Sequence, residues 1–85
     1  NGQEDHVSMG ANSAIKLFKV VNNLNTILSI ELMNSVQALE LKKVKSSKIV
    51  MNFIKSYRKK VPFINHDVIL SEYIFKGKEF ISNYL

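Results

Sequence analysis

The chain has 85 residues, of which 46% are hydrophobic and 22% charged, with a net charge of +5 and no cysteine. This composition excludes a disulfide framework and a thiolate metal site, and it is too hydrophobic for a disordered tail. The sequence shows neither a basic n-region followed by an apolar core nor an uncharged apolar run of about 18 residues, so we expect no signal peptide, no membrane span and a cytoplasmic location.

Residues 1–8 are polar, include two adjacent acids and show no hydrophobic period, which predicts a loop. From Met9 to about Leu41 there is no proline, and apolar residues recur with helical spacing. Ser8 is a candidate N-cap for this helix. Because apolar positions cover most of its circumference, the pattern is typical of a helix buried inside a bundle.

The length of this predicted helix is informative by itself. About 33 residues at a rise of 1.5 Å form a rod of roughly 50 Å. A compact domain of this chain length has a diameter near 30 Å, estimated from its expected radius of gyration. Either the helix breaks near Asn22 and Asn23, or the chain is one piece of a larger helical assembly. We favour the second interpretation.

Two shorter helices are predicted after the long one. Ser46 or Ser47 can cap a helix over 47–60, which ends before Pro62. Apolar spacing then predicts a third helix over 67–84. The sequence therefore predicts an all-α chain without an internal domain boundary, with one long buried helix at about 9–41 and two shorter helices, as part of a larger bundle.

The strongest candidate for chemistry is Gln3-Glu4-Asp5-His6, which places an amide, two carboxylates and an imidazole ahead of an apolar helix. A polar cluster at the mouth of a bundle can hold the charged end of a substrate. The alternative is a solvated loop whose acids favour the helix N-terminus.

Other kinds of site have less support. His6 and His66 are 60 positions apart, and no two candidate ligands have the spacing of one helix face, so we expect no metal site. Ser8 and His6 lack a glycine-rich elbow and an orienting third group, which argues against a nucleophile and base pair.

Residues 42–60 contain eight lysines or arginines and no acid, and such a stretch can bind phosphates. Its aromatic residues, Phe53 and Tyr57, have core spacing rather than the exposed arrangement of single-strand binding proteins. We interpret the stretch as a solvated helix face and expect no nucleic acid partner.

The run from Gln3 to Gly10, Gln-Glu-Asp-His-Val-Ser-Met-Gly, resembles the C-terminal signature of the histidine ammonia-lyase family. Residues 27–32 and 36–41 resemble the Leu-Ala-Ile-Glu-Leu and Ala-Gln-Ala-Leu-Asp-Leu-Arg segments of that family. Ser46-Ser47 and the turn at 57–63 look like the tail of a bacterial branch that includes tyrosine ammonia-lyases. The resemblance covers essentially the whole chain.

This resemblance implies an all-helical homotetrameric enzyme that eliminates ammonia from an aromatic amino acid. The family's electrophile is a methylidene-imidazolone group formed from Ala-Ser-Gly, a tripeptide that residues 1–85 do not contain. The chain is then a C-terminal segment, inactive alone, whose partners are the rest of the lyase chain, its tetramer mates and a small aromatic amino acid. No metal or membrane is expected.

By position, Glu4 corresponds to the family's active-site carboxylate, which is both catalytic and substrate-binding. Gln3 would line the same pocket, while Asp5 and His6 would structure the active-site loop at 1–8. Glutamate at this position is typical of family members that convert L-histidine to urocanate, whereas phenylalanine-specific members typically have glutamine there.

Asn1-Gly2 stands where the family usually has Ala-Asn, and this pair is similar to tyrosine-acting lyases and aminomutases. A tyrosine or phenylalanine ammonia-lyase, or an aminomutase, is therefore an alternative to the histidine enzyme. A non-enzymatic alternative is a helical oligomerisation module without an active site.

Overall fold

The computed structural model describes the backbone of residues 2–43 and 45–84 and the side chains of residues 10–43 and 45–84. Helix α1 runs over Gly2–Lys42, α2 over Lys48–Lys60 and α3 over Leu70–Tyr84. All regular elements in these ranges are helices, which confirms the all-α prediction.

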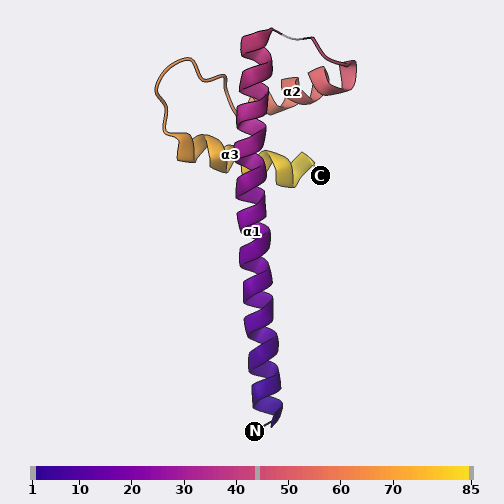
Figure 1. Ribbon diagram of the computed structural model, residues 1–85, viewed down its shortest axis with the longest axis vertical. Coiled ribbons are helices and arrows are strands. Elements are labelled where there is room, and N and C mark those ends of the chain that lie inside the picture. Colours follow the sequence, from indigo (N-terminus) through magenta and orange to yellow (C-terminus); the bar gives the residue numbers. More distant parts are fainter. Residues whose placement is uncertain (1, 44, 85) are drawn as a thin grey trace.

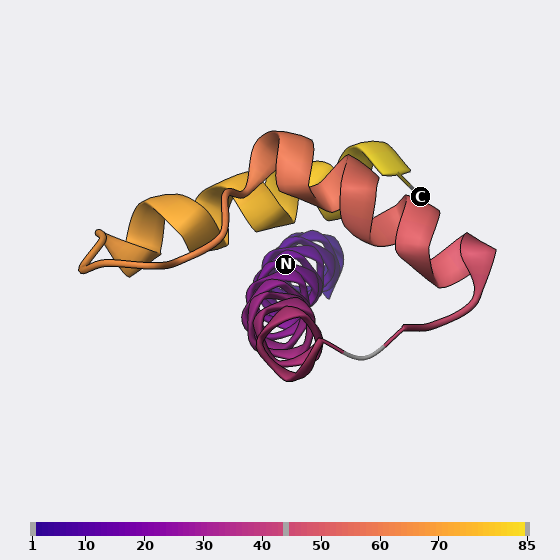
Figure 2. The same cartoon turned by 90° about the horizontal axis from the view of Figure 1, so that it is seen from above.

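Helix α1 is a continuous rod, and α2 and α3 lie on one side of its C-terminal half (Figures 1 and 2). The longest dimension of the molecule is 62 Å and its radius of gyration is 18.1 Å, against about 12 Å for a compact chain of this length. The helix passes Asn22 and Asn23 without interruption. A break at these asparagines is therefore wrong, and the long rod is confirmed.

The start of α1 differs from the prediction. The helix begins at Gly2, so the predicted loop at residues 1–8 and the N-cap at Ser8 are wrong for the backbone that the structure describes. Residues 3–9 include no glycine or proline, and the intrinsic helix propensities of such residues differ by only about 0.7 kcal/mol. Polarity alone therefore does not stop the helix here.

Helix α2 agrees closely with its prediction. The Val50 amide donates to Ser47 Oγ at 3.3 Å, so Ser47 is the N-cap. Helix α3 begins at Leu70, three residues later than predicted, and Ile69 O accepts from the Glu72 amide at 3.1 Å in its first turn. Residues 67–69 belong to a connector that is bonded to α1 at Ile64, a long-range contact that apolar spacing does not reveal.

The core lies where the three helices meet. It contains five buried side chains, with aromatic rings in edge-on contact at centroid distances of 5.4 Å (Phe53–Phe80 and Tyr57–Phe80). These buried residues are Val36, Ile54, Tyr57, Val61 and Phe80. The core therefore involves only the C-terminal part of α1.

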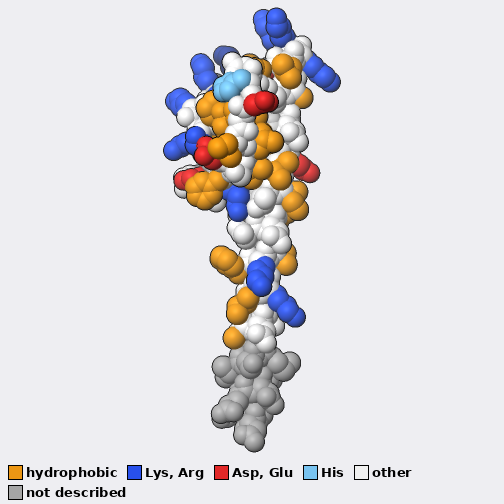
Figure 3. Space-filling model, turned by 90° about the vertical axis from the view of Figure 1, so that its left-hand side faces the viewer, with side chains coloured by type: hydrophobic (Ala, Val, Ile, Leu, Met, Phe, Trp, Pro, Cys, Tyr) orange, Lys and Arg blue, Asp and Glu red, His pale blue; other side chains and the backbone are white. Residues whose placement is uncertain are grey.

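Between residues 10 and 24, α1 is uncovered in the described part of the chain. Every side chain from residue 10 to residue 24 is exposed, including the large apolar ones (Figure 3). The described residues therefore do not provide the burial that was predicted for this stretch of the helix. The exposed apolar residues in this stretch are Ile15, Leu17, Phe18, Val20, Val21 and Leu24. An apolar surface of this extent marks an interaction site, and its burial in a larger bundle stays a prediction.

Helices α1 and α3 cross in close contact at Ser29 and Gly77. Ser29 is fully buried, and its Oγ donates to the Ile74 carbonyl at 2.7 Å. A Cβ on residue 77 would overlap Ser29 Oγ and lie 3.4 Å from its Cβ. The glycine, which is unfavourable in a helix by propensity alone, is therefore explained by the close crossing.

Gly77→Ala is expected to weaken the docking of α3 by about 1–3 kcal/mol, since overpacking exceeds the roughly 1 kcal/mol gained from helix propensity. Hydrogen exchange of α3 amides in the intact protein measures this effect. The double variant Ser29→Ala/Gly77→Ala should be more stable than Gly77→Ala alone, because the overlapping hydroxyl is gone. Ser82→Ala, at an exposed position of α3, is the matched control. Faster exchange of α3 amides in Ser82→Ala, or exchange in Gly77→Ala that is unchanged from the wild type, would contradict the close crossing.

Candidate functional site

The predicted site residues Gln3, Glu4, Asp5 and His6 lie in the first turns of α1, and their side chains are outside the part that the structure describes. This end of the rod points away from α2 and α3 (Figure 1). The 25 residues from Glu4 to the crossing at Ser29 correspond to about 38 Å of helix. A site that included these residues would have only one helix end from this chain and would need its remaining walls from other elements.

His66 is the second of the two histidines of the sequence. His66 and Asp67 lie in the exposed connector before α3, and His66 Nδ1 is 2.5 Å from Asn65 Oδ1. In the described ranges no three His, Asp or Glu side chains are grouped so that they could hold a metal ion.

Nor does any described helix have the length and apolarity needed to cross a membrane.

The basic stretch at 42–60 is divided between surface and core. Its seven lysines are exposed, whereas Arg58 forms an ion pair with Glu40. Phe53 and Tyr57 face the helical core, as their spacing predicted. The aromatic residues of this stretch are thus unsuited to stacking on bases.

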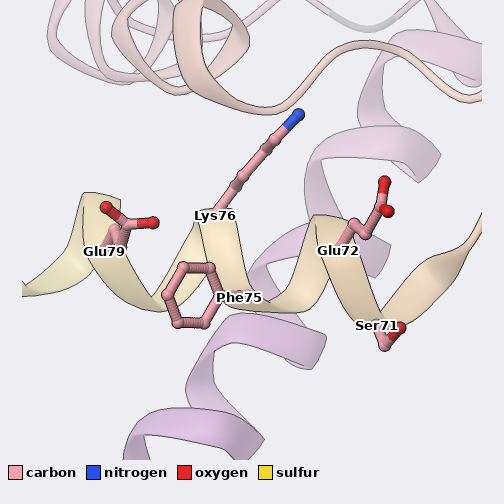
Figure 4. A pocket seen from close by; sticks show the side chains of 5 residues that line it. All are labelled: Ser71, Glu72, Phe75, Lys76 and Glu79. Carbon is pink, nitrogen blue, oxygen red and sulfur yellow. The ribbon is translucent and has the colours of Figure 1, made fainter.

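A shallow pocket lies on the outer side of α3, lined by Ser71, Glu72, Phe75, Lys76 and Glu79. Lys76 extends between Glu72 and Glu79, and the pocket opens to solvent (Figure 4). Charged groups in open solvent are strongly screened. The pocket therefore lacks the desolvated, convergent polar groups of an active site.

Sequence reasoning missed one buried polar group in the core. Tyr57 is fully buried, and its hydroxyl has no hydrogen-bond partner in the described part of the chain. Burial raises the pKa of Tyr57 above its ordinary value of 10.0, with Arg58 opposing this shift. The neutral phenol is the form that the core favours.

Tyr57→Phe is expected to stabilise the helical core by about 1 kcal/mol, because it removes a hydroxyl that is buried without a partner. The raised pKa also predicts that stability provided by neutral Tyr57 is present below pH 10 and lost as the pH rises through the folded-state pKa. The phenylalanine variant should lose less stability than the wild type in that range. Thermal unfolding of the wild type and of Tyr57→Phe from pH 8 to 11 tests this prediction. An equal loss of stability with rising pH in both proteins would contradict it.

Comparison with known proteins decides the family. Residues 1–59 match the family model for aromatic amino acid lyases, which includes the segment that carries Glu4. The chain belongs to the aromatic amino acid lyase family. This result confirms the relationship that the resemblance implied, and the helical fold of the chain agrees with it.

Several curated relatives of this lyase segment are named histidine ammonia-lyase. That of Treponema denticola is 39% identical over 82 residues, covering 95% of this chain and 16% of its own length. That of Deinococcus radiodurans is 40% identical over 65 residues, or 76% of this chain and 12% of its own length. That of Anaeromyxobacter dehalogenans is 40% identical over 67 residues, covering 78% of this chain and 13% of its own length. No solved structure matches the chain.

The chain thus spans between 12% and 16% of the length of these curated relatives. The match includes Glu4 and most of the helical core, because it extends through residue 59. The segment therefore corresponds to a small part of each of these relatives.

Proposed function

We propose that the intact protein containing this chain is an ammonia-lyase that converts L-histidine to urocanate and ammonia. The observation that carries the proposal is the family match over residues 1–59, which includes Glu4, together with relatives named histidine ammonia-lyase. Glutamate at position 4 agrees with the histidine-specific pattern of the resemblance.

Glu4 is assigned the catalytic and substrate-binding role. An ionised carboxylate can accept a hydrogen bond from the imidazole N–H of histidine and can assist proton movement near the departing amine. Gln3 is assigned to the wall of the same pocket, since an amide can both donate and accept. Asp5 and His6 are assigned to holding this segment in position.

The methylidene-imidazolone group does not fit the residues present, because residues 1–85 contain no Ala-Ser-Gly. In this proposal the tripeptide lies elsewhere in the intact protein, and the isolated chain is inactive. No catalytic step is assigned to the group here. The family relationship supports this arrangement, as the chain spans a small part of its relatives.

The rest of the lyase chain and the other subunits of a cytoplasmic homotetramer are the proposed partners. The exposed apolar residues of α1 support this part of the proposal, because side chains such as Leu17 and Phe18 are 64% and 72% exposed in this chain. Burying each of them against a partner would contribute about 1.5–3 kcal/mol.

The function is tested by comparing kcat/KM of the intact protein for L-histidine, L-tyrosine and L-phenylalanine, with identification of each product. The proposal predicts that L-histidine is preferred and gives urocanate and ammonia. A preference for L-tyrosine with an arylacrylate product would indicate a tyrosine lyase. Formation of a β-amino acid would indicate an aminomutase. Absence of turnover with all three would favour the oligomerisation module.

A further inference from the structure

Gln37 of α1 binds the backbone of the connector between α2 and α3. Its Nε2 donates to the Ile64 carbonyl at 2.7 Å, and its Oε1 accepts from the Ile64 amide at 3.2 Å. One side-chain amide thus satisfies both backbone groups of a single connector residue. This pairing fixes the position of the connector on α1.

Arg58, near the end of α2, joins the same contact. Its Nε donates to Glu40 Oε1 at 2.8 Å, and one terminal nitrogen donates to Gln37 Oε1 at 3.3 Å. The other terminal nitrogen donates to the carbonyls of Val61 and Pro62 at 3.1 and 3.2 Å. A single guanidinium therefore connects α1, the end of α2 and the first connector residues.

The surroundings of Arg58 favour this arrangement. The guanidinium carbon lies 5.5 Å from the ring centroids of both Tyr57 and Phe63. The Arg58 and Glu40 side chains are 16% and 32% exposed, so their ion pair is less screened than one in open solvent. The planar fork makes several directed bonds that a lysine ammonium cannot reproduce.

Helix α3 follows this connector and covers one face of α1. Ser29 is fully buried at the crossing, and Met33 and Val36, which follow it along α1, are 7% and 2% exposed. Residues 65–67 of the connector are exposed. The connector is bonded to α1 directly at Ile64 through Gln37, and indirectly at Val61 and Pro62 through Arg58.

We propose that Gln37, Glu40 and Arg58 form a latch, and that α3 with its connector is a strap over residues 29–36 of α1 that opens as a unit when the latch is broken. The strap is then held by the latch, by the Ser29–Gly77 crossing and by the packing of Phe80 against the aromatic rings of α2. This inference concerns the conformation of the chain and does not depend on the proposed reaction.

Hydrogen exchange in the intact protein tests the latch, with Arg58→Lys and Gln37→Ala compared with the wild type. The α3 amides should exchange about tenfold faster or more in each variant, corresponding to the loss of hydrogen bonds to a charged group or a buried peptide. Amides at 28–41 of α1 should change by less than about twofold, since α1 remains helical without the strap. Lys55→Ala, an exposed residue of α2, is the control and should change neither set.

Glu40→Gln keeps the size of the side chain and an acceptor oxygen, so it provides a milder variant if the others fail to fold. It should accelerate exchange of α3 by a smaller factor than Arg58→Lys. In the double variant Gln37→Ala/Arg58→Lys, the acceleration of α3 exchange should be smaller than the combined effect of the two single substitutions, because both residues act through the same contact. Unchanged α3 exchange in the folded variants, or equal acceleration in α1 and α3, would overturn the latch.

Discussion

Glu4→Gln is expected to lower kcat/KM for L-histidine by at least about 100-fold in the intact protein, the lower range of what a positioned acid or base contributes. Glutamine has nearly the same size but carries no charge and cannot take up a proton at neutral pH. Steady-state urocanate formation measures the effect. Because the resemblance associates glutamine here with phenylalanine-specific enzymes, the ratio of activity on L-phenylalanine to L-histidine should rise.

Asp5→Asn is the matched control for this substitution, since it removes a carboxylate from the neighbouring position. It should reduce activity much less than Glu4→Gln does and should act mainly by lowering thermal stability. If Glu4→Gln retained activity within a few fold, or if both variants lost activity equally, the role assigned to Glu4 would be wrong.

The isolated 85-residue chain is expected to self-associate, and Leu24→Glu should shift it toward the 9.7 kDa monomer. Leu17, Val21, Leu24 and Leu28 recur at intervals of three or four residues along α1 and are 40–64% exposed. Such a stripe is stabilised only when another apolar surface covers it, and a charge in its middle opposes that contact. Sedimentation velocity over a range of concentrations measures the change.

Lys19→Glu is the control for the stripe, because Lys19 is an exposed charged residue of the same helix and is not one of the apolar residues of the stripe. It should leave the association of the isolated chain nearly unchanged. A wild-type chain that sedimented as a compact monomer and unfolded cooperatively would contradict the inference that α1 needs partners.

Local features of the fold were predictable from the sequence. The Ser47 cap and the end of α2 before Pro62 depend on residues within one helical turn of each other, so their pattern is direct evidence. The length of α1 also followed from the absence of proline in a long periodic stretch. Its first turns did not, because polar residues are compatible with both a loop and a helix.

Contacts between distant parts of the chain were not predictable in the same way. Ser29 and Gln37 are polar residues of a long helix, and nothing next to them in sequence shows that Ser29 meets α3 and Gln37 meets the connector. Gly77 is unfavourable in a helix by propensity, and the reason for a glycine at this position lies in α1. Such positions become interpretable only when the crossing of the helices is known.

The candidate site was found by resemblance and not by helical spacing. The run of adjacent polar residues identified a cluster at residues 3–6, whereas the family signature singled out Glu4 within it. The structure adds its location at the end of α1, about 38 Å of helix from the crossing with α3. The elements that complete the pocket belong to the proposed remainder of the lyase.

The role of Glu4 can be observed in a structure of the intact protein with bound urocanate, by measuring the distance from the Glu4 carboxylate to the imidazole of the product. We predict that a carboxylate oxygen lies within hydrogen-bond distance of a ring nitrogen, about 2.6–3.2 Å. Glu4 on a solvent-exposed stretch of α1, with the product bound elsewhere, would contradict the assignment of this residue to the active site.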